Sequence, residues 1–244
     1  MSKFSTRTTQ FSYFDKQLGR PVWANKKILD FGGNVGGFLE SANAGINHEH
    51  YWCVDLSRAA VEEGKRRFPR AHFVFYDRYS CEYNPAGIRG LALPDLGHAF
   101  DFALAFSVFT HTAKAEMLEL VGQLKRELND NGVLAFTFTD PQYDPGRGSN
   151  LKHRLELWKL RYPSIDVNAL LDRASGARWC TLVNDQLYVE PDDAGARLEE
   201  SGASYLTFFT REYMSSILPH AEILPPVSPE WQHCCVIRKG GGDE

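Results

Sequence analysis

The chain has 244 residues, a length that allows one large domain or two small ones. Hydrophobic residues make up 43% of the sequence, charged residues make up 24%, and the formal net charge of −4 argues against a protein that mainly holds nucleic-acid phosphates. Because the five cysteines form no CxxC pair and no apolar run approaches the length of a membrane span, we expect a reduced, cytoplasmic protein without a metal site, a disulfide framework or a membrane span.

From residue 26 onward, short apolar runs alternate with stretches of helical spacing. The sequence predicts strands at residues 27–31, 51–56, 72–76, 101–106 and 133–139. It predicts helices at residues 38–44, 57–68 and 114–128. Strands that alternate with helices indicate βαβ units and a parallel sheet with helices on both faces. In such sheets, ligands bind outside the carboxyl ends of the strands.

Residues 141–200 interrupt this alternation. Within them, the sequence predicts helices at 151–161 and 166–174 and short strands at 179–183 and 186–189. The pattern then returns with strands at 204–210 and 233–238, on either side of a helix at 211–218. We therefore predict an α/β fold with a Rossmann-like, seven-stranded, mostly parallel sheet, a cap inserted after strand five and an antiparallel edge hairpin made by the last two strands.

We expect a single domain with four parts. They are an N-terminal helical segment (1–25), a core (26–140), the inserted cap (141–200), and a final helix with the edge hairpin (201–239).

A glycine-rich segment follows the first predicted strand and precedes a helix. It reads DFGGNVGGF over residues 30–38. Glycines at such a place let the backbone turn tightly and approach a ligand closely, and Asn34 tolerates a positive φ better than most residues do. A purely structural strand–turn–helix corner remains open as an alternative.

Asp55 ends the second predicted strand. An acidic side chain at this position can accept two hydrogen bonds from a ribose diol, or it can stabilise the start of the next helix ahead of Ser57. The G-x-G-x-x-G fingerprint of NAD-dependent dehydrogenases fails, because Asn34 stands where the second glycine is required. Neither a P-loop nor a G-x-S-x-G elbow is present.

The glycine segment and the second strand together resemble a known family. ILDFGGNVGGF followed by WCVDLS is similar to the class I S-adenosylmethionine (SAM)-dependent methyltransferases, whose loop runs acidic–x–Gly–x–Gly–x–Gly. FDFALAFSVFTH and LNDNGVLAFTFTD resemble the family's fourth-strand segment and its turn into strand five. The resemblance covers about residues 26–140 and returns weakly over 204–239, and Asn34 and Asn131 depart from the family's glycines.

The resemblance implies SAM as the methyl donor and S-adenosylhomocysteine (SAH) as the product. It assigns cofactor binding to residues after strands one to four, namely Asp30, Gly32, Gly33, Asn34, Gly36, Asp55, Leu56, Asp77, Ser107 and Val108. Asp77 is expected near the adenine amino group. Similar enzymes close an N-terminal helical lid over SAM; here Phe11, Tyr13, Phe14 and Trp23 belong to that segment, although packing on the sheet is the simpler interpretation of these rings.

Methyl transfer is an in-line displacement, so the protein mainly aligns the reacting atoms, and it needs a base only if the nucleophile arrives protonated. His111, after the fourth strand, and Asp140, at the end of the fifth, are the candidate catalytic residues. Tyr143 and His153 are further candidates for the base. Capping or packing is the alternative role for His111, and loop capping before Pro141 is the alternative for Asp140.

The cap suggests the class of acceptor. An insertion of this size on a minimal core favours a closed pocket for a small molecule, so we expect O- or N-methylation of a small-molecule acceptor, with secondary metabolism as one setting. We expect no nucleic-acid or membrane partner, and a monomer or homodimer. An RNA or protein methyltransferase and a non-catalytic SAM-fold binding protein remain alternatives.

Two groups of side chains in and after the cap bear on that acceptor. Aromatic residues that would line an apolar pocket, or simply pack in a core, are Trp158, Tyr162, Trp179, Tyr188 and Phe208. Basic residues that would recognise an acidic or phosphorylated substrate, or remain screened surface charge, are Arg147, Lys152, Arg154, Lys159 and Arg161.

Overall fold

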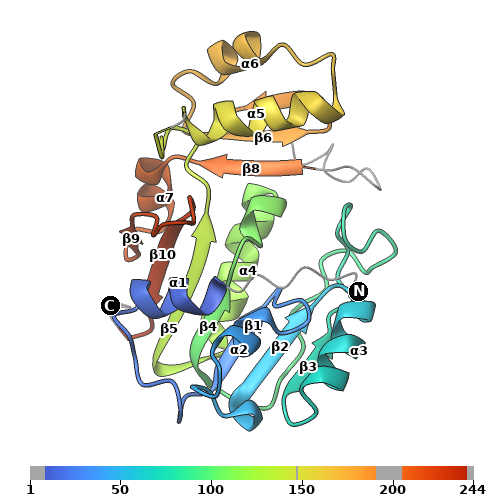
Figure 1. Cartoon of the computed structure of the whole chain (residues 1–244), viewed down its shortest axis with the longest axis vertical. Coiled ribbons are helices and arrows are strands. Elements are labelled where there is room, and N and C mark those ends of the chain that lie inside the picture. The colour runs from blue at the N-terminus through green and yellow to red at the C-terminus, as the bar shows by residue number, and fades with distance from the viewer. Residues whose placement is uncertain (1–8, 147, 191–204, 241–244) are drawn as a thin grey trace.

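A seven-stranded sheet in the order β3-β2-β1-β4-β5-β10-β9 forms the centre of the computed structural model, which describes residues 9–146, 148–190 and 205–240 (Figure 1). Its strands are β1 (Ile28–Phe31), β2 (Tyr51–Asp55), β3 (His72–Phe75), β4 (Phe100–Ala105), β5 (Leu128–Phe138), β9 (Glu222–Leu224) and β10 (His233–Arg238). The first five strands run parallel, and β10 pairs antiparallel with both β5 and β9. The predicted Rossmann-like, mostly parallel sheet of seven strands is confirmed.

Helices cover both faces of this sheet. They are α1 (Gln10–Gln17), α2 (Gly37–Ser41), α3 (Arg58–Arg67), α4 (Lys114–Arg126) and α7 (Arg211–Ile217), with short 3-10 helices η1 (His48–His50) and η2 (Phe109–His111). Ser57 begins α3 as predicted, because its Oγ accepts a hydrogen bond from the backbone N–H of Ala60 at 3.2 Å. No helix in the described part of the chain combines the length and apolar character needed to cross a bilayer.

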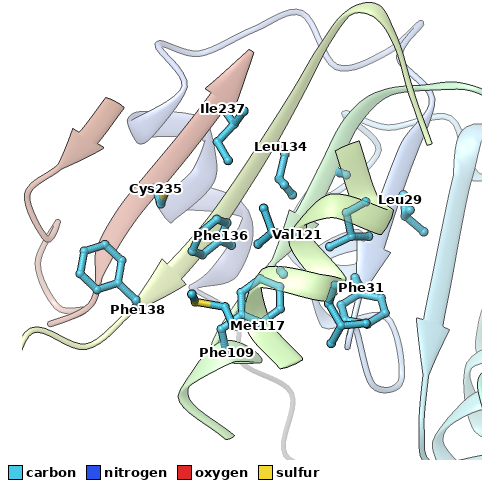
Figure 2. Close-up of a cluster of buried hydrophobic side chains, with 14 of the residues drawn as sticks. Leu29, Phe31, Phe109, Met117, Val121, Leu134, Phe136, Phe138, Cys235 and Ile237 are labelled. Atoms are coloured by element: carbon cyan, nitrogen blue, oxygen red, sulfur yellow. The ribbon is translucent and has the colours of Figure 1, made fainter. Parts of the chain in front are cut away.

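Successive residues of each strand point to opposite faces of the sheet, which divides the core into two buried clusters. On one face, Leu29 and Phe31 pack with Met117 and Val121 of α4, and Figure 2 shows these side chains with those of β5 and β10. On the other face, Ile28 packs in the cluster to which α1, α2 and α3 contribute.

A second, three-stranded sheet in the order β7-β6-β8 builds the cap, which lies beyond the carboxyl end of β5 (Figure 1). Its elements are α5 (Asn150–Arg161), α6 (Val167–Ala174), β6 (Trp179–Val183), β7 (Gln186–Val189) and β8 (Tyr205–Phe209). The helices and short strands predicted between residues 141 and 200 are therefore present within the described residues.

The prediction that residues 204–210 form a strand of the main sheet is wrong. Residues 205–209 form β8, which pairs antiparallel with β6 and places Thr207 opposite Thr181, and residue 204 lies outside the described residues. Phe208 is buried in the cap core with Leu155 and Leu182, so this strand completes the cap. The antiparallel edge hairpin is instead made by β9 and β10, and β9 has only three residues, too few to show a strand pattern in the sequence.

The chain leaves the core for the cap and returns from it at neighbouring points. The backbone N–H of Phe209, at the end of β8, donates to the carbonyl of Thr139, at the end of β5, at 3.0 Å. The backbone N–H of Arg211 donates to the Asp140 carboxylate at 3.2 Å. The division of the chain into lid, core, cap and edge segment stays a prediction.

Substitutions at two helical glycines can test how the helices pack on the sheet, because the two positions have different surroundings. A Cβ on Gly64 of α3 would overlap the Phe73 ring of β3, whereas a Cβ on Gly122 of α4 would come no closer than 4.0 Å to Arg126. Gly64→Ala should therefore lower the free energy of unfolding by about 1–3 kcal/mol through overpacking. Gly122→Ala should raise it by about 0.5–1 kcal/mol, because alanine loses less backbone entropy in a helix. Urea denaturation of both variants measures the two changes, and changes of the same sign would contradict the packing described.

Candidate active site

A cavity of about 360 Å³ lies at the carboxyl ends of β1, β2 and β4, which is where parallel α/β sheets bind ligands. The glycine segment, the end of β2 and the turn after β4 supply most of its wall. Of the residues that the resemblance assigns to the cofactor, those lining this cavity are Gly32, Gly33, Asn34, Asp55, Leu56, Ser107 and Val108.

The glycine segment holds a conformation that few side chains permit. Gly32 has φ +75°, and a Cβ at this position would lie 2.5 Å from Cγ2 of Val108. Asn34 has φ 53°, the left-handed conformation that asparagine tolerates. The loop after β1 therefore packs directly against the turn after β4, and this close approach shapes the cavity wall.

Asp55 joins the glycine segment to the start of α3. Its Oδ2 accepts a hydrogen bond from the backbone N–H of Asn34 at 2.8 Å, and its Oδ1 accepts one from the backbone N–H of Ser57 at 2.7 Å. Burial raises the pKa of Asp55, while the N–H groups of Ser57 and Asn34 oppose the rise. Asp55 thus lines the cavity and also orders two of its walls, which confirms its place at the start of the next helix, while its contact with a ribose diol stays a prediction.

Asp30 lies behind the loop and is absent from the cavity wall. Its side chain is 3% exposed, and the Tyr51 hydroxyl donates to its Oδ2 at 2.5 Å. Burial raises the pKa of Asp30 to about 7, the Tyr51 hydrogen bond lowers it and the charge of Asp55 raises it further. The Asp30 carboxyl therefore does not line the cavity. It supports the loop from behind, against Gly33.

Gly36 also belongs to the scaffold of the loop. It precedes α2 with φ +86°, and its N–H donates to the carbonyl of Gly33 at 2.9 Å. A Cβ on Gly36 would lie 3.0–3.1 Å from the Phe73 and Phe68 rings, so glycine is required here by packing and by backbone conformation.

The expected adenine contact, Asp77, is also absent from the cavity wall. Its Oδ1 accepts a hydrogen bond from Asn84 Nδ2 at 3.0 Å. Its neighbours Tyr76 and Arg78 line the cavity instead, together with Glu116 of α4. The structure therefore places the residues on either side of Asp77, and not Asp77 itself, in the cavity wall.

Arg78 is the best-anchored of these unexpected lining residues. Its guanidinium donates to Glu119 at 2.8 Å, to Glu116 at 3.2 Å and to the carbonyl of Leu91 at 2.8 Å. This network ties the segment after β3 to α4. Sequence patterns gave no sign of it, because the partners are about 40 positions apart in the chain.

His111 lies in η2, directly after β4, where it lines the same cavity. Its Nδ1 is 3.3 Å from Oε2 of Glu82, and the Tyr83 hydroxyl is 3.4 Å from each ring nitrogen. An imidazole held by a carboxylate is an arrangement suited to accepting a proton. Glu82 and Tyr83 carry no motif of their own, so the sequence alone did not indicate them.

A second cavity, of about 340 Å³, lies between the core and the cap. It shares three residues with the first cavity, Tyr83, Ser107 and His111, so the two spaces adjoin at these side chains. Its other lining residues are Glu82, Thr110, Thr139, Arg154, Trp158, Arg161, Leu206, Thr207, Phe208 and Gln232.

Two of the five aromatic pocket candidates, Trp158 and Phe208, line this second cavity. The other three lie elsewhere. Tyr162 donates its hydroxyl hydrogen to Asn184 Oδ1 at 3.2 Å, Trp179 packs in the main core, and Tyr188 donates to Gln186.

The other predicted bases lie away from both cavities. Oδ1 of Asp140 accepts the backbone N–H of Gln142 at 2.8 Å while Oδ2 accepts that of Arg211, which is the capping role considered for this residue. Tyr143 packs edge-on against the ring of His233, and His153 packs against the ring of Trp231.

The N-terminal aromatic residues pack as a helix on the sheet. Tyr13 and Phe14 of α1 are buried, and the Phe11 ring contacts Phe38 of α2 with centroids 5.4 Å apart. Gln10, at the start of α1, lines the first cavity. Closure of a lid stays a prediction, and residues 1–8 and Arg147 lie outside the described residues.

Metal-ligating side chains do not gather in the described part of the chain. Over residues 9–146, 148–190 and 205–240, no three His, Cys, Asp or Glu side chains form a group that could hold a metal ion.

Comparison with known proteins gives a family match over the cavity-forming core. Residues 29–134 match the model of a methyltransferase domain family. A search of curated proteins found no match. The match includes the glycine segment, Asp55 and His111, and so spans the residues that line the first cavity from β1 to α4.

Solved structures extend the likeness to almost the whole chain. The SAM-bound amino pentose methyltransferase CalS10 of Micromonospora echinaspora is 16% identical, with 97% of this chain and 92% of that chain covered at a TM-score of 0.54. A SAM-dependent methyltransferase of Clostridium acetobutylicum is 10% identical (98% and 94% covered, TM-score 0.54). The glycopeptide N-methyltransferase MtfA, solved with sinefungin, is 9% identical (97% and 87% covered, TM-score 0.55). At these identities the likeness shows the fold.

The buried Asp30 gives a testable pH dependence. Its pKa rises from about 3.9 in an unfolded chain to about 7 in the folded protein. The stability contributed by its neutral form is therefore complete below the unfolded value and is lost as pH rises through the folded value, at about 1.4 kcal/mol per pH unit. Asp30→Asn keeps an acceptor for the Tyr51 hydroxyl and removes the titration.

The free energy of unfolding of Asp30→Asn, minus that of the wild type, should thus increase between pH 4 and pH 7 and level off above. Denaturant titrations across this range measure the difference. Asp130→Asn, which changes an exposed carboxylate outside the buried clusters, is the surface control. A constant difference for Asp30→Asn would contradict the raised pKa.

Proposed function

We propose, from the premise that the core of this chain belongs to the class I SAM-dependent methyltransferases, that the protein transfers a methyl group from SAM to an oxygen or nitrogen atom of a small-molecule acceptor. One observation carries the proposal: a cavity lined by the glycine segment and Asp55 adjoins a second cavity at Ser107 and His111. Two adjoining sites of this kind suit a donor and an acceptor that must meet in line.

The residues of the first cavity fit SAM. Its volume lies within the range of small-molecule sites, and its wall combines a carboxylate with apolar side chains. Asp55 keeps lone pairs beyond its two backbone hydrogen bonds and would hold the ribose diol. Leu56, Val108 and Leu120 offer apolar surface for the adenine ring.

When bound, SAM supplies an activated methyl group, and the electron pair of its carbon–sulfur bond stays on sulfur, so that SAH is the product. The chain contributes alignment and, for a protonated acceptor, a base. Ser107, Tyr83 and His111 border both cavities and would set the position of the accepting atom. Glu82, beside Nδ1 of His111, would keep a proton on that nitrogen and leave Nε2 to take the acceptor's proton.

The small-molecule acceptor is supported by the second cavity, which core and cap build together. A cytoplasmic location is part of this proposal, and the buried thiols of all five cysteines are compatible with it. A role in secondary metabolism, the lack of a nucleic-acid partner and a monomeric or homodimeric state stay predictions.

Asp55→Ala should weaken SAM binding by about tenfold or more, equivalent to about 1.4 kcal/mol, because it removes a polar contact and the acceptor that orders Asn34. Asp77→Asn should leave the dissociation constant within about twofold, since its amide oxygen still accepts from Asn84. Calorimetric titration with SAM and SAH compares both variants with the wild type. If Asp77→Asn weakened SAM binding more than Asp55→Ala did, the cofactor would contact Asp77, as the family resemblance implies and the cavity lining does not.

His111→Asn should lower the rate of SAH formation by about 100-fold or more with a hydroxyl acceptor, while SAM affinity changes by less than threefold. Glu82→Gln should cause a smaller loss and shift the acidic limb of the pH–rate profile, because Glu82 acts through His111. Turnover is measured as SAH release with a panel of phenols and amines. His153→Asn, on α5 but away from both cavities, is the matched control, and an equal loss there would contradict the assignment.

A further inference from the structure

The second cavity carries positive charge in a chain whose net charge is −4. Arg154, Trp158 and Arg161 all line it, and their spacing of i, i+4 and i+7 places them on one face of α5. That face of the cap helix therefore contributes Arg154, Trp158 and Arg161 to one wall of the cavity, and the Arg161 guanidinium also lies over the Tyr162 ring, 5.4 Å from its centroid.

The remaining lining residues are mostly neutral. Leu206 and Phe208 of β8 add apolar surface, while Ser107, Thr110 and Thr139 add hydroxyl groups from the core. Glu82 is the one carboxylate among the described residues that line the cavity, and it lies beside the His111 ring. The charged side chains that line this cavity among the described residues are thus Arg154, Arg161 and Glu82, with the His111 ring beside Glu82.

The helix that carries the arginines is fixed at both ends. Ser149 Oγ accepts the backbone N–H of Lys152 at 3.3 Å, and Asn150 Nδ2 donates to the carbonyl of Asp140 at 3.0 Å. Further along, the Trp158 indole N–H donates to the carbonyl of Asn184. A rigid element positions binding groups more accurately than a loop does, and α5 is anchored in this way.

We propose that the methyl acceptor is a small anionic molecule, with a carboxylate or phosphate bound by Arg154 and Arg161, an apolar body against Trp158 and Phe208, and the accepting atom at His111. This inference rests on the proposed methyl transfer. A guanidinium group matches carboxylate and phosphate oxygens in a planar fork. The two Cα atoms are about 10 Å apart along the helix, a span that two arginine side chains can close around one group.

The test uses pairs of probes that differ in charge: benzoate against benzamide, and phenyl phosphate against phenol. Each is titrated into the SAH complex of the full-length protein, with binding followed by ligand-observed NMR. The wild type should bind the anionic member of at least one pair about tenfold or more tightly than the neutral member. The two pairs distinguish a carboxylate from a phosphate.

Arg154→Gln and Arg161→Gln should each reduce this preference about fivefold or more, and the double variant should abolish it. Lys159→Gln removes an exposed cation of the same helix that does not line the cavity, and it should keep the preference. An unchanged affinity for SAH shows that each variant remains folded.

Equal binding of charged and neutral probes, a preference that survives in the double variant, or no anion binding to the SAH complex would overturn the inference. Tighter binding of a short RNA oligonucleotide that displaces the anionic probe would also overturn it, because the arginines would then serve a macromolecule. If the wild type does not bind SAH, the proposed function itself is contradicted. If the wild type binds SAH but does not prefer the anionic probes, only the inference about the acceptor is contradicted.

Discussion

The Asp55 carboxylate, with one oxygen on the Asn34 N–H and the other on the Ser57 N–H, is the constraint on which the site depends. These two hydrogen bonds join the loop after β1 to the turn that begins α3. Gly32 can then approach Val108, because no Cβ intervenes. Three segments from three βα units thereby form one continuous wall. The charged form of a buried carboxylate is costly, and the two backbone donors offset much of that cost.

A second buried carboxyl supports the same loop differently. Burial raises the pKa of Asp30 to about 7 although the hydrogen bond from Tyr51 opposes the rise, so near neutral pH the group exists partly as the uncharged acid. A fully ionised Asp30 would add its repulsion to that of Asp55 within a few residues of the loop. The acidic residues near the ends of β1 and β2 therefore have different roles, since Asp55 lines the cavity and Asp30 supports the backbone behind it.

The sheet, the glycine segment and the position of Asp55 could be predicted from the sequence. Strand patterns, a residue that tolerates a positive φ (Asn34) and a helix-capping residue are all recognised from residues that are neighbours in the chain. Contacts between residues far apart in the chain could not be predicted from the sequence. Asp140 holds the N–H of Arg211, 71 positions later, and His111 meets Glu82, 29 positions earlier. Asp77 accepts a hydrogen bond from Asn84 in the segment after β3 and does not line the cavity, which no local pattern indicated. The sequence of β8 also fits either sheet, and only its pairing with β6 decides between them.

The hydrogen bond between Phe209 and Thr139 has a consequence for how such proteins diversify. Both chain crossings between core and cap lie next to each other, so the inserted region begins and ends at almost one point in space. Closing such a short gap costs little chain entropy, and insertions of any length between those points are compatible with the same sheet. The cap is therefore an exchangeable module. Recombination at this junction would exchange the cap and leave the seven-stranded sheet and the first cavity in place.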